Sequence, residues 1–200
     1  MTTKQRGRPK LDEQAINQKR AMIVASAKHL FRESGVEAVS MRKIAAESGV
    51  GTMTLYKYFA TKREILHFIW LEFFDELFGV IAECPQQLDA FERLSWKCNQ
   101  YLDYWIEHPD RYRMVFLNED RADSGDDFFV NHADIEAKFN QFFLQDLIAV
   151  TQTNSEETLT LSHEVMCLLN GIALNTITIS EYAWQPGRQI LQSYLARLPH

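Results

Sequence analysis

Apolar residues recur at helical spacing along almost the whole chain, and this spacing constrains the fold more than any other feature. Such a period places apolar side chains on one face of an α-helix, whereas a half-buried β-strand shows strict alternation. Glycine and proline are sparse, with 8 and 5 among 200 residues, so few positions interrupt a helix. We therefore predict an all-α fold without a repeated structural unit.

Cap and turn residues divide this pattern into separate helices. Gly35 is placed to end the first helix in a left-handed conformation, and Ser40 is a good N-cap for the second. Thr61 and Glu64 have the spacing of a capping box at the start of a long apolar helix, which Pro85 ends. We expect helices over residues 17–34, from 41 to a turn at 48–50, and over 52–59, 62–82, 86–107, a short stretch after 109, 128–151, 156–181 and 186–197.

Charge is unevenly distributed along the chain, although the whole carries a net −6. Residues 1–60 contain 11 Lys and Arg against 5 Asp and Glu, a net of +6, and residues 61–200 carry a net of −12. A basic segment on an acidic body indicates an anionic partner for that segment. The alternative is a solvated charged surface, and charge alone does not separate the two.

The sequence shows no sign of export or of membrane insertion. No stretch approaches the run of about 18 apolar residues that a membrane span needs, and the basic N-terminal segment lacks the apolar core of a signal peptide. Cys84, Cys98 and Cys167 lie far apart without a CxxC pair, so we interpret them as small apolar side chains rather than as a disulfide framework. We expect a cytoplasmic protein without a membrane partner.

Residues 40–59, SMRKIAAESGVGTMTLYKYF, carry the strongest local pattern in the chain. Ala45 is small enough for two helices to cross closely, and Gly49 supplies the left-handed conformation of a short turn between them. Leu55 and Phe59 lie on inward faces and can close a core with the first helix. The last helix of this three-helix unit is short, polar and aromatic, which suits insertion into a DNA major groove.

The segment from Thr54 to Leu66, TLYKYFATKREIL, closely resembles the signature of the TetR/AcrR family of transcription regulators. The resemblance extends over residues 19–66, about a quarter of the chain. It implies a helix-turn-helix domain that binds double-stranded DNA, a palindromic operator and a homodimer. One departure is Gly51-Thr52-Met53, where relatives often carry Ser-Lys before the recognition helix, so the bases that relatives read do not carry over.

Tyr56, Tyr58 and Lys62 resemble the family's phosphate-contacting positions. Phenolic hydroxyls and an ammonium at the start of a helix suit phosphate oxygens. For Tyr56 the alternative is packing of its ring. We also expect Ser40 to cap its helix and to direct the first amides of that helix at a phosphate.

Other positions of the motif are candidates for contacts with bases or with further phosphates. At least one of Arg42 and Lys43 is expected to touch DNA, and the other is then only solvated. Lys57 can reach a phosphate or a guanine. The candidates for base edges, where a methyl group can meet a thymine methyl, are Thr52, Met53 and Thr54.

The N-terminal arm carries a second signal for DNA. Residues 1–15 are polar, and we expect them to be disordered when the protein is free. Arg6-Gly7-Arg8-Pro9 is similar to the core of an AT-hook, in which Gly lets the backbone approach the minor groove and Arg6 and Arg8 follow its negative potential. The alternative is a basic tail that only aids solubility.

The chain beyond residue 65 is rich in large aromatic side chains. Such residues are more often core than ligand contacts, but flat rings at this density favour a cavity for a small apolar or aromatic effector. Asn170 is the candidate polar group that orients this ligand, with His163 and Glu164 on the same helix, and each can instead be satisfied within the protein. The predicted ring contacts are Trp70, Phe74, Trp105 and Tyr112.

Residues 165–179 are apolar around almost the whole helix, interrupted by Gly171 and Ala173. A helix of this kind must be covered on both sides. The simplest cover for the outer side is a second copy of the chain, with the last helix completing a four-helix interface. The resemblance also implies this dimer.

An enzyme or a lipid carrier is the alternative class. The sequence contains no HExxH, GxSxG or Gly-rich phosphate loop, so we expect no catalytic residue, metal or cofactor. The predicted organisation is an arm over 1–15, a helix-turn-helix domain over 16–64, and a helical-bundle domain for ligand binding and dimerisation over 65–200, joined by a long helix. By analogy with the family, the expected function is a repressor that releases its operator when the effector binds.

Overall fold

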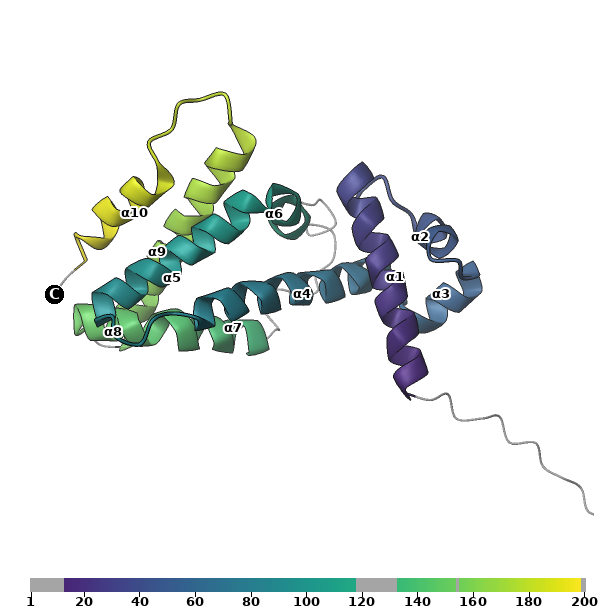
Figure 1. The fold of residues 1–200 in the computed structure, drawn as a ribbon, viewed down its shortest axis with the longest axis horizontal. Coiled ribbons are helices and arrows are strands. Elements are labelled where there is room, and N and C mark those ends of the chain that lie inside the picture. The colour runs from purple at the N-terminus through teal and green to yellow at the C-terminus, as the bar shows by residue number, and fades with distance from the viewer. Residues whose placement is uncertain (1–12, 118–132, 154, 199–200) are drawn as a thin grey trace, which may run out of the picture. The chain divides into compact units, whose positions relative to one another are not determined.

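The computed structural model of the chain describes residues 13–117, 133–153 and 155–198. Within these ranges the regular elements are ten α-helices and one π-helical stretch (Figure 1). The prediction of an all-α fold is therefore confirmed. The chain divides into two compact units, of which the first ends at Ile69 and the second begins at Trp70, inside α4 (Lys62–Ala82).

The first unit is a small bundle around one apolar core. It consists of α1 (Glu13–Ser34), α2 (Met41–Glu47), α3 (Thr52–Tyr58) and the first turns of α4. The first helix starts at Glu13, earlier than the expected residue 17. Each helix contributes to the buried core, which includes Ile23, Phe31, Ile44, Leu55, Phe59 and Ile65.

The residues predicted to form the turns and the cap of this unit do so in the structure. Gly35 and Gly49 have φ values of 78° and 64°, in the left-handed region that a residue without a Cβ adopts at little cost. The side chain of Ser40 accepts a hydrogen bond from the backbone N–H of Lys43 at 3.3 Å and so caps α2. These local signals fix where α1 ends and where α2 begins.

The capping box before α4 is present with one difference. The backbone N–H of Glu64 donates to Oγ1 of Thr61 at 3.1 Å, as expected for an N-cap threonine. The Glu64 carboxylate, however, accepts from the N–H of Ala60 at 2.7 Å rather than from that of Thr61. The start of α4 is thus tied to the residue that follows α3 and its C-cap.

The second unit packs the rest of α4 with the remaining helices, whose order is shown in Figure 1. α5 lies against α8, α9 and α10, and α9 also contacts α8 and α10. The bounds are α5 (Ala90–Glu107), α6 (Pro109–Phe116), α7 (Ala133–Phe139), the π-helix η2 (Asn140–Leu144), α8 (Gln145–Thr151), α9 (Ser155–Thr178) and α10 (Gly187–Leu195).

The helix expected over 128–151 is observed from residue 133 onward, and its first residues lie outside the described ranges. It is interrupted by η2, where the backbone follows the wider π-helical pattern. A π-helical insertion shifts the faces of the residues around it and is often found near functional sites. Here it accompanies three aromatic contacts: Phe139 with Phe78 at 5.0 Å, Phe142 with Phe78 at 5.6 Å, and Phe139 with Phe143 at 6.0 Å between ring centroids.

A buried carboxylate joins α5 to α8. Asp146 is 4% exposed and accepts from Arg93 Nε at 2.8 Å and from Lys97 Nζ at 2.6 Å. Lys97 also donates to the backbone carbonyl of Phe142 at 2.7 Å, and Arg93 to that of Leu88 at 2.8 Å. Because the carboxylate is fully paired, its burial does not leave an isolated charge in the core.

Two of the three cysteines are buried, as expected of small apolar side chains. Cys84 and Cys98 lie in the core of the second unit, where burial raises the pKa of the Cys98 thiol to about 12. Cys167 is exposed, so the interpretation was wrong there, because α9 leaves that side uncovered by its own chain. No helix in the described part of the chain is long and apolar enough to cross a membrane.

Candidate nucleic-acid interface

The third helix exposes one face to solvent, while two apolar side chains hold its other face against the core. Leu55 and Phe59 are completely buried against the core of the first unit. On the opposite side, Met53 is 79% exposed and Tyr56 is 50% exposed. The packing of the Tyr56 ring against the core, which was its alternative role, is therefore only partial. Thr52 and Lys57 are also exposed, and Thr54 is half-buried.

The DNA contacts predicted for α2 lie at the N-terminal end of that helix. Ser40, Arg42 and Lys43 are all exposed. The ammonium of Lys43 donates to the carbonyl of Ala38 at 3.3 Å, so the loop before α2 holds this side chain. Arg42, the other residue of the pair, is exposed, and its planar guanidinium carries several hydrogen-bond donors.

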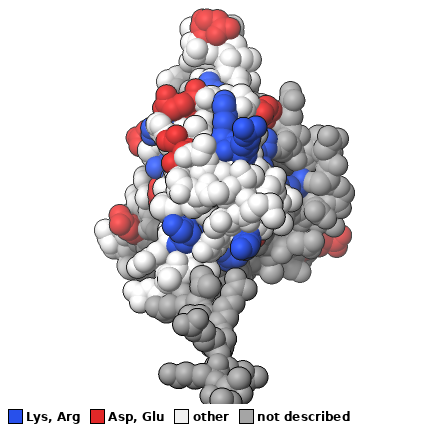
Figure 2. All heavy atoms as spheres, turned by 90° about the vertical axis from the view of Figure 1, so that its right-hand side faces the viewer, with Lys and Arg blue, Asp and Glu red and all other residues white. Residues whose placement is uncertain are grey.

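Positive charge surrounds the exposed surface of α2 and α3. Figure 2 views the protein from the side where these helices lie in Figure 1: Lys and Arg side chains flank a central area without charge, and Asp and Glu side chains lie farther out, mainly toward the upper left. The first turns of α2 and α3 contain no acidic residue. Such a surface attracts an anionic polymer and does not repel it at the point of closest approach.

Lys62 has a role that its sequence position did not show. Its ammonium donates to the backbone carbonyl of Val36 at 3.0 Å, and the side chain is half-buried. The lysine thus joins the start of α4 to the loop between α1 and α2.

Arg20 is a functional candidate that sequence reasoning missed. It extends from α1 and donates from Nη2 to the carbonyl of Tyr58, the last residue of α3, at 3.3 Å. Its guanidinium also lies 5.6 Å from the ring centroid of Phe59 and 5.5 Å from that of Phe68. No local pattern marks this residue, because its partners are 38 or more positions away in the sequence. Tyr58 itself is half-buried.

In the second unit, the predicted ligand contacts come together as one aromatic cluster. Trp70, Phe74, Trp105 and Tyr112 are between 0 and 3% exposed. The ring of Trp105 meets those of Phe74 and Tyr112 edge to face, with centroids 5.8 and 5.9 Å apart. Asn170 is half-buried beside them and accepts from the hydroxyls of two tyrosines.

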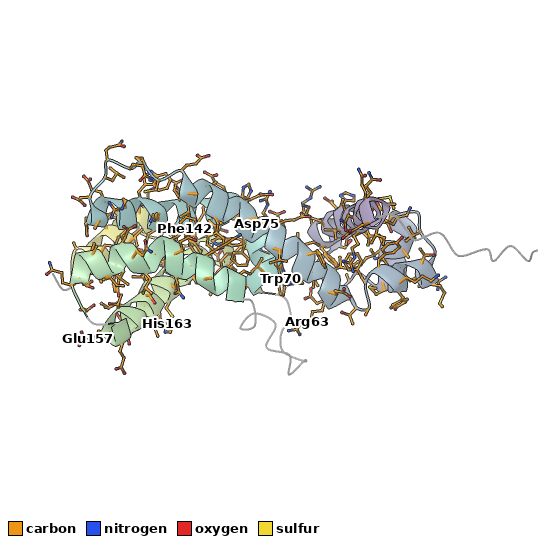
Figure 3. The ribbon with its side chains drawn as sticks, turned by 90° about the horizontal axis from the view of Figure 1, so that it is seen from below. Arg63, Trp70, Asp75, Phe142, Glu157 and His163 are labelled. Carbon is orange, nitrogen blue, oxygen red and sulfur yellow. The ribbon has the colours of Figure 1, made fainter. Side chains whose placement is uncertain are left out.

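The other polar candidates do not reach this cluster. His163 and Glu164 are exposed on α9, and Figure 3 shows His163 directed away from the aromatic side chains. The Glu164 carboxylate accepts from the hydroxyl of Tyr194 at 2.8 Å. For Glu164 the structure thus agrees with the alternative role, a polar group satisfied within the protein. Arg6 and Arg8 of the arm lie outside the described residues.

A short turn between two small helices, with the second helix anchored inside and polar outside, defines the class of helix-turn-helix proteins. The comparisons with known proteins agree with this class. The family described as "Bacterial regulatory proteins, tetR family" matches residues 23–69. An uncharacterized HTH-type transcriptional regulator of Mycobacterium tuberculosis is 28% identical over 126 residues, which are 62% of this chain and 53% of that protein. The chain thus spans about half the length of the curated relatives it matches first.

Solved structures support the fold of both units. A TetR-family transcriptional regulator from Syntrophomonas wolfei superposes with a TM-score of 0.69 at 18% identity, over 91% of this chain and 95% of that one. The regulator FadR from Bacillus subtilis, solved in complex with stearoyl-CoA, superposes with a TM-score of 0.68 at 15% identity, over 89% and 96%. Residues 23–69 thus carry the DNA-binding domain of the TetR family of helix-turn-helix regulators, and the fold of the chain is the one seen in solved members of that family. The match of residues 23–69 to a family of transcription regulators agrees with the expectation that the chain is not an enzyme.

Proposed function

We propose that this chain is a dimeric transcription repressor that binds a palindromic operator through α2 and α3 and releases it when a small molecule binds the second unit. One observation carries the DNA-binding role. The third helix exposes Met53 and Tyr56 while Leu55 and Phe59 fix its inner face. A helix held in this way can enter a major groove without losing its own packing. Repression follows the majority behaviour of the family.

Within this proposal, the exposed residues divide into two groups. Tyr56, Tyr58 and Lys62 bind phosphates, together with Ser40 and Arg42, and hold the register of the protein on the duplex. Because Lys43 is bonded to the carbonyl of Ala38, we assign the contact of that pair to Arg42. The residues that read base edges are Thr52, Met53 and Thr54, with Lys57 on a phosphate or a guanine.

Selection from a pool of randomised duplexes, followed by fluorescence anisotropy on the enriched sequence, tests the DNA-binding role. We expect a two-fold symmetric sequence to be enriched. The Met53→Ala variant should lose discrimination at one position of each half-site by about 1 to 3 kcal/mol. The control is Arg32→Ala, which removes an exposed charge from α1 that is paired with Glu33. Failure to enrich any sequence would contradict the proposal.

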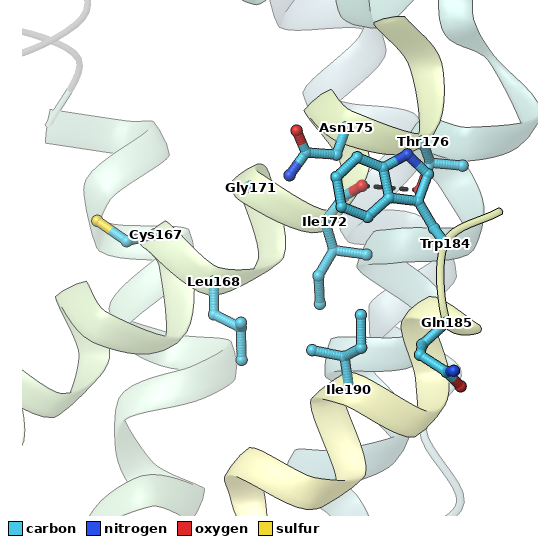
Figure 4. Close-up of a pocket in the computed structure, with 9 residues that line it drawn as sticks. All are labelled: Cys167, Leu168, Gly171, Ile172, Asn175, Thr176, Trp184, Gln185 and Ile190. Carbon is cyan, nitrogen blue, oxygen red and sulfur yellow. Dashed lines mark hydrogen bonds between the residues drawn. The ribbon is translucent and has the colours of Figure 1, made fainter. Parts of the chain in front are cut away.

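The dimer is proposed to form through α9 and α10. A groove of about 280 Å³ lies on these helices. Figure 4 shows Leu168, Ile172 and Ile190 among its lining residues, with the indole of Trp184 above them. Leu174 on α9 and Ile179 directly after it are 36% and 38% exposed. A second copy of the same surface buries these apolar side chains on both protomers, as closed two-fold symmetry requires.

The arm and the compartment complete the proposal. Arg6 and Arg8 are proposed to follow an A·T-rich minor groove beside each half-site. A chromosomal operator places the protein in the cytoplasm.

The effector is proposed to be a small apolar or aromatic molecule held by Trp70, Phe74, Trp105, Tyr112 and Asn170. The support is the convergence of these rings in one buried cluster of the second unit. The FadR of Bacillus subtilis, a protein of this fold, was solved with stearoyl-CoA, whose acyl chain is apolar.

A further inference from the structure

The indole N–H of Trp105 is buried without a hydrogen-bond acceptor. Trp105 is 0% exposed, and within the described part of the chain its Nε1 has no hydrogen-bond partner. Two other indoles are satisfied, since Trp70 donates to the carbonyl of Met114 at 3.0 Å and Trp184 to that of Ile179 at 2.9 Å. A buried donor without an acceptor loses its hydration and gains nothing in return, so native proteins rarely retain one.

The surroundings of Trp105 are flat rings placed edge to face. Such contacts hold the indole plane firmly, so its N–H points in one fixed direction. The rings and their centroid distances from Trp105 are Tyr104 at 5.0 Å, Phe116 at 5.3 Å, Phe74 at 5.8 Å, Tyr112 at 5.9 Å and Tyr101 at 6.2 Å.

The polar groups nearest to this indole already have partners. Tyr101 donates its hydroxyl to Oδ1 of Asn170 at 3.0 Å, and Tyr112 donates to the backbone carbonyl of the same residue at 3.1 Å. The Asn170 amide in turn donates to Met166 at 3.0 Å. The Tyr101 oxygen lies close to the Trp105 indole and keeps lone pairs after donating its proton to Asn170, but it does not meet hydrogen-bond geometry with Nε1. Within the described residues, this N–H therefore has no acceptor in hydrogen-bond geometry.

An anion is a poor fit for the missing acceptor. Burial raises the pKa of the Tyr101 hydroxyl and that of Tyr112, which means that the surroundings disfavour a negative charge. A neutral oxygen, such as that of a ketone or an ester, accepts a hydrogen bond without this cost.

A groove between α4 and α7 leads toward the same point. It measures about 430 Å³, and its lining includes Phe74 and Phe78. Phe74 is thus shared, because it lines the groove and its ring also meets Trp105 edge to face. The ion pair of Asp75 with Lys138 joins the two sides of the groove, and both side chains are largely solvated, so it is a weak closure. Figure 3 shows Asp75 at this junction of α4 and α7.

We propose that the second unit binds a flat, uncharged, mostly apolar molecule with one hydrogen-bond acceptor, and that Trp105 Nε1 donates to this acceptor. The molecule enters through the groove between α4 and α7 and displaces the ring of Phe74 to reach the indole. This inference rests on the proposed function and names the chemistry of its effector.

A matched pair of probes tests the acceptor directly. 2-Acetylnaphthalene and 2-ethylnaphthalene have nearly the same shape, but only the ketone carries an acceptor. We expect the full-length protein to bind the ketone about five-fold more tightly, the effect of one hydrogen bond. In Trp105→Phe this ratio should fall to about one while the ethyl compound binds as before. In the control Trp96→Phe, a half-buried tryptophan of the same helix, the ratio should be unchanged.

A measurement on the wild-type protein covers the case in which Trp105→Phe does not fold. Among the four tryptophans, the ¹⁵N-labelled indole resonance of Trp105 is identified by elimination with variants of the other three. It should move downfield with the ketone and much less with the ethyl compound. Equal affinities for the two probes, an unmoved resonance, or no binding of either probe would overturn the inference. Operator binding is measured in parallel, and its loss would count against the proposed function instead.

Discussion

Arg20 shows how a cation in a DNA-binding domain can position a helix without contacting DNA. It joins α1 to the carbonyl of Tyr58, the last residue of α3. Lys57, by contrast, is exposed on α3. A residue that contacts a phosphate displaces a counterion, whereas a residue that positions a helix does not.

This difference gives a prediction at the residue scale. Lys57→Ala should weaken operator binding and lower the slope of log K against log salt by about one. Arg20→Met should weaken binding by about 1 to 2 kcal/mol, since a hydrogen bond and ring contacts are lost, without changing the slope. Anisotropy titrations at several salt concentrations measure both quantities. A reduced slope for Arg20→Met would place that guanidinium on the DNA.

At the scale of elements, local signals predicted the helices well and the distant contacts poorly. Gly35, Gly49 and Ser40 act where the sequence placed them, because caps and turns depend on neighbouring residues. The π-helical stretch after Phe139 was not foreseen, since apolar periodicity does not distinguish it from an α-helix. Nor was the partner of Arg20, which lies on another helix.

The candidate site divides in the same way. Exposure of Met53 and burial of Leu55 follow from the period of one short helix, so the sequence was sufficient. The exposure of His163 could not be predicted, because the composition of α9 does not say which of its faces the rest of the bundle covers. The unpaired indole of Trp105 depends on five rings from different elements and has no signature in the sequence.

The uncovered surface of α9 gives a prediction about the dimer. A Cβ added at Gly171 would meet no neighbouring atom, so a large side chain there leaves the protomer intact. Gly171→Trp should therefore project into the groove of Figure 4 and clash only with a second copy. We expect monomers in sedimentation velocity with unchanged helical content. The matched control is Gly79→Trp, at an equally open position of α4. An intact Gly171→Trp dimer would move the interface elsewhere.

The arm gives a second prediction at this scale. Deleting residues 1–10 removes Arg6 and Arg8 together with Lys4 and Lys10. Binding should weaken most on operators whose half-sites are flanked by A·T pairs, because arginine follows the negative potential of a narrow minor groove. Affinities on A·T-flanked and G·C-flanked duplexes make the comparison. An equal loss of affinity on both duplexes would mean that the arm contributes only nonspecific positive charge.

For the whole molecule, regulation requires that the effector and the operator favour different states. Since α4 contributes to both compact units, a displacement of Phe74 acts on a helix that begins at Lys62. Operator binding must then lower the affinity for the effector by the same factor by which effector binding lowers the affinity for the operator. For 2-acetylnaphthalene we expect a loss of about 5- to 150-fold in affinity at saturating operator. Phe74→Trp should change this response and leave the dimer intact. Identical affinities for 2-acetylnaphthalene with and without operator would show that the aromatic cluster is not coupled to DNA release.

The spacing of the two recognition helices tests the central claim most directly. Two α3 helices in a dimer can read successive major grooves only if their half-sites lie on one face of the duplex, about 34 Å apart or a multiple of it. Inserting five base pairs between the half-sites of the selected operator rotates them by about half a turn. We predict that this duplex binds at least about 100-fold more weakly than the parent, close to the level of nonspecific DNA. Equal affinity for the two duplexes would contradict a dimer that reads DNA through α2 and α3.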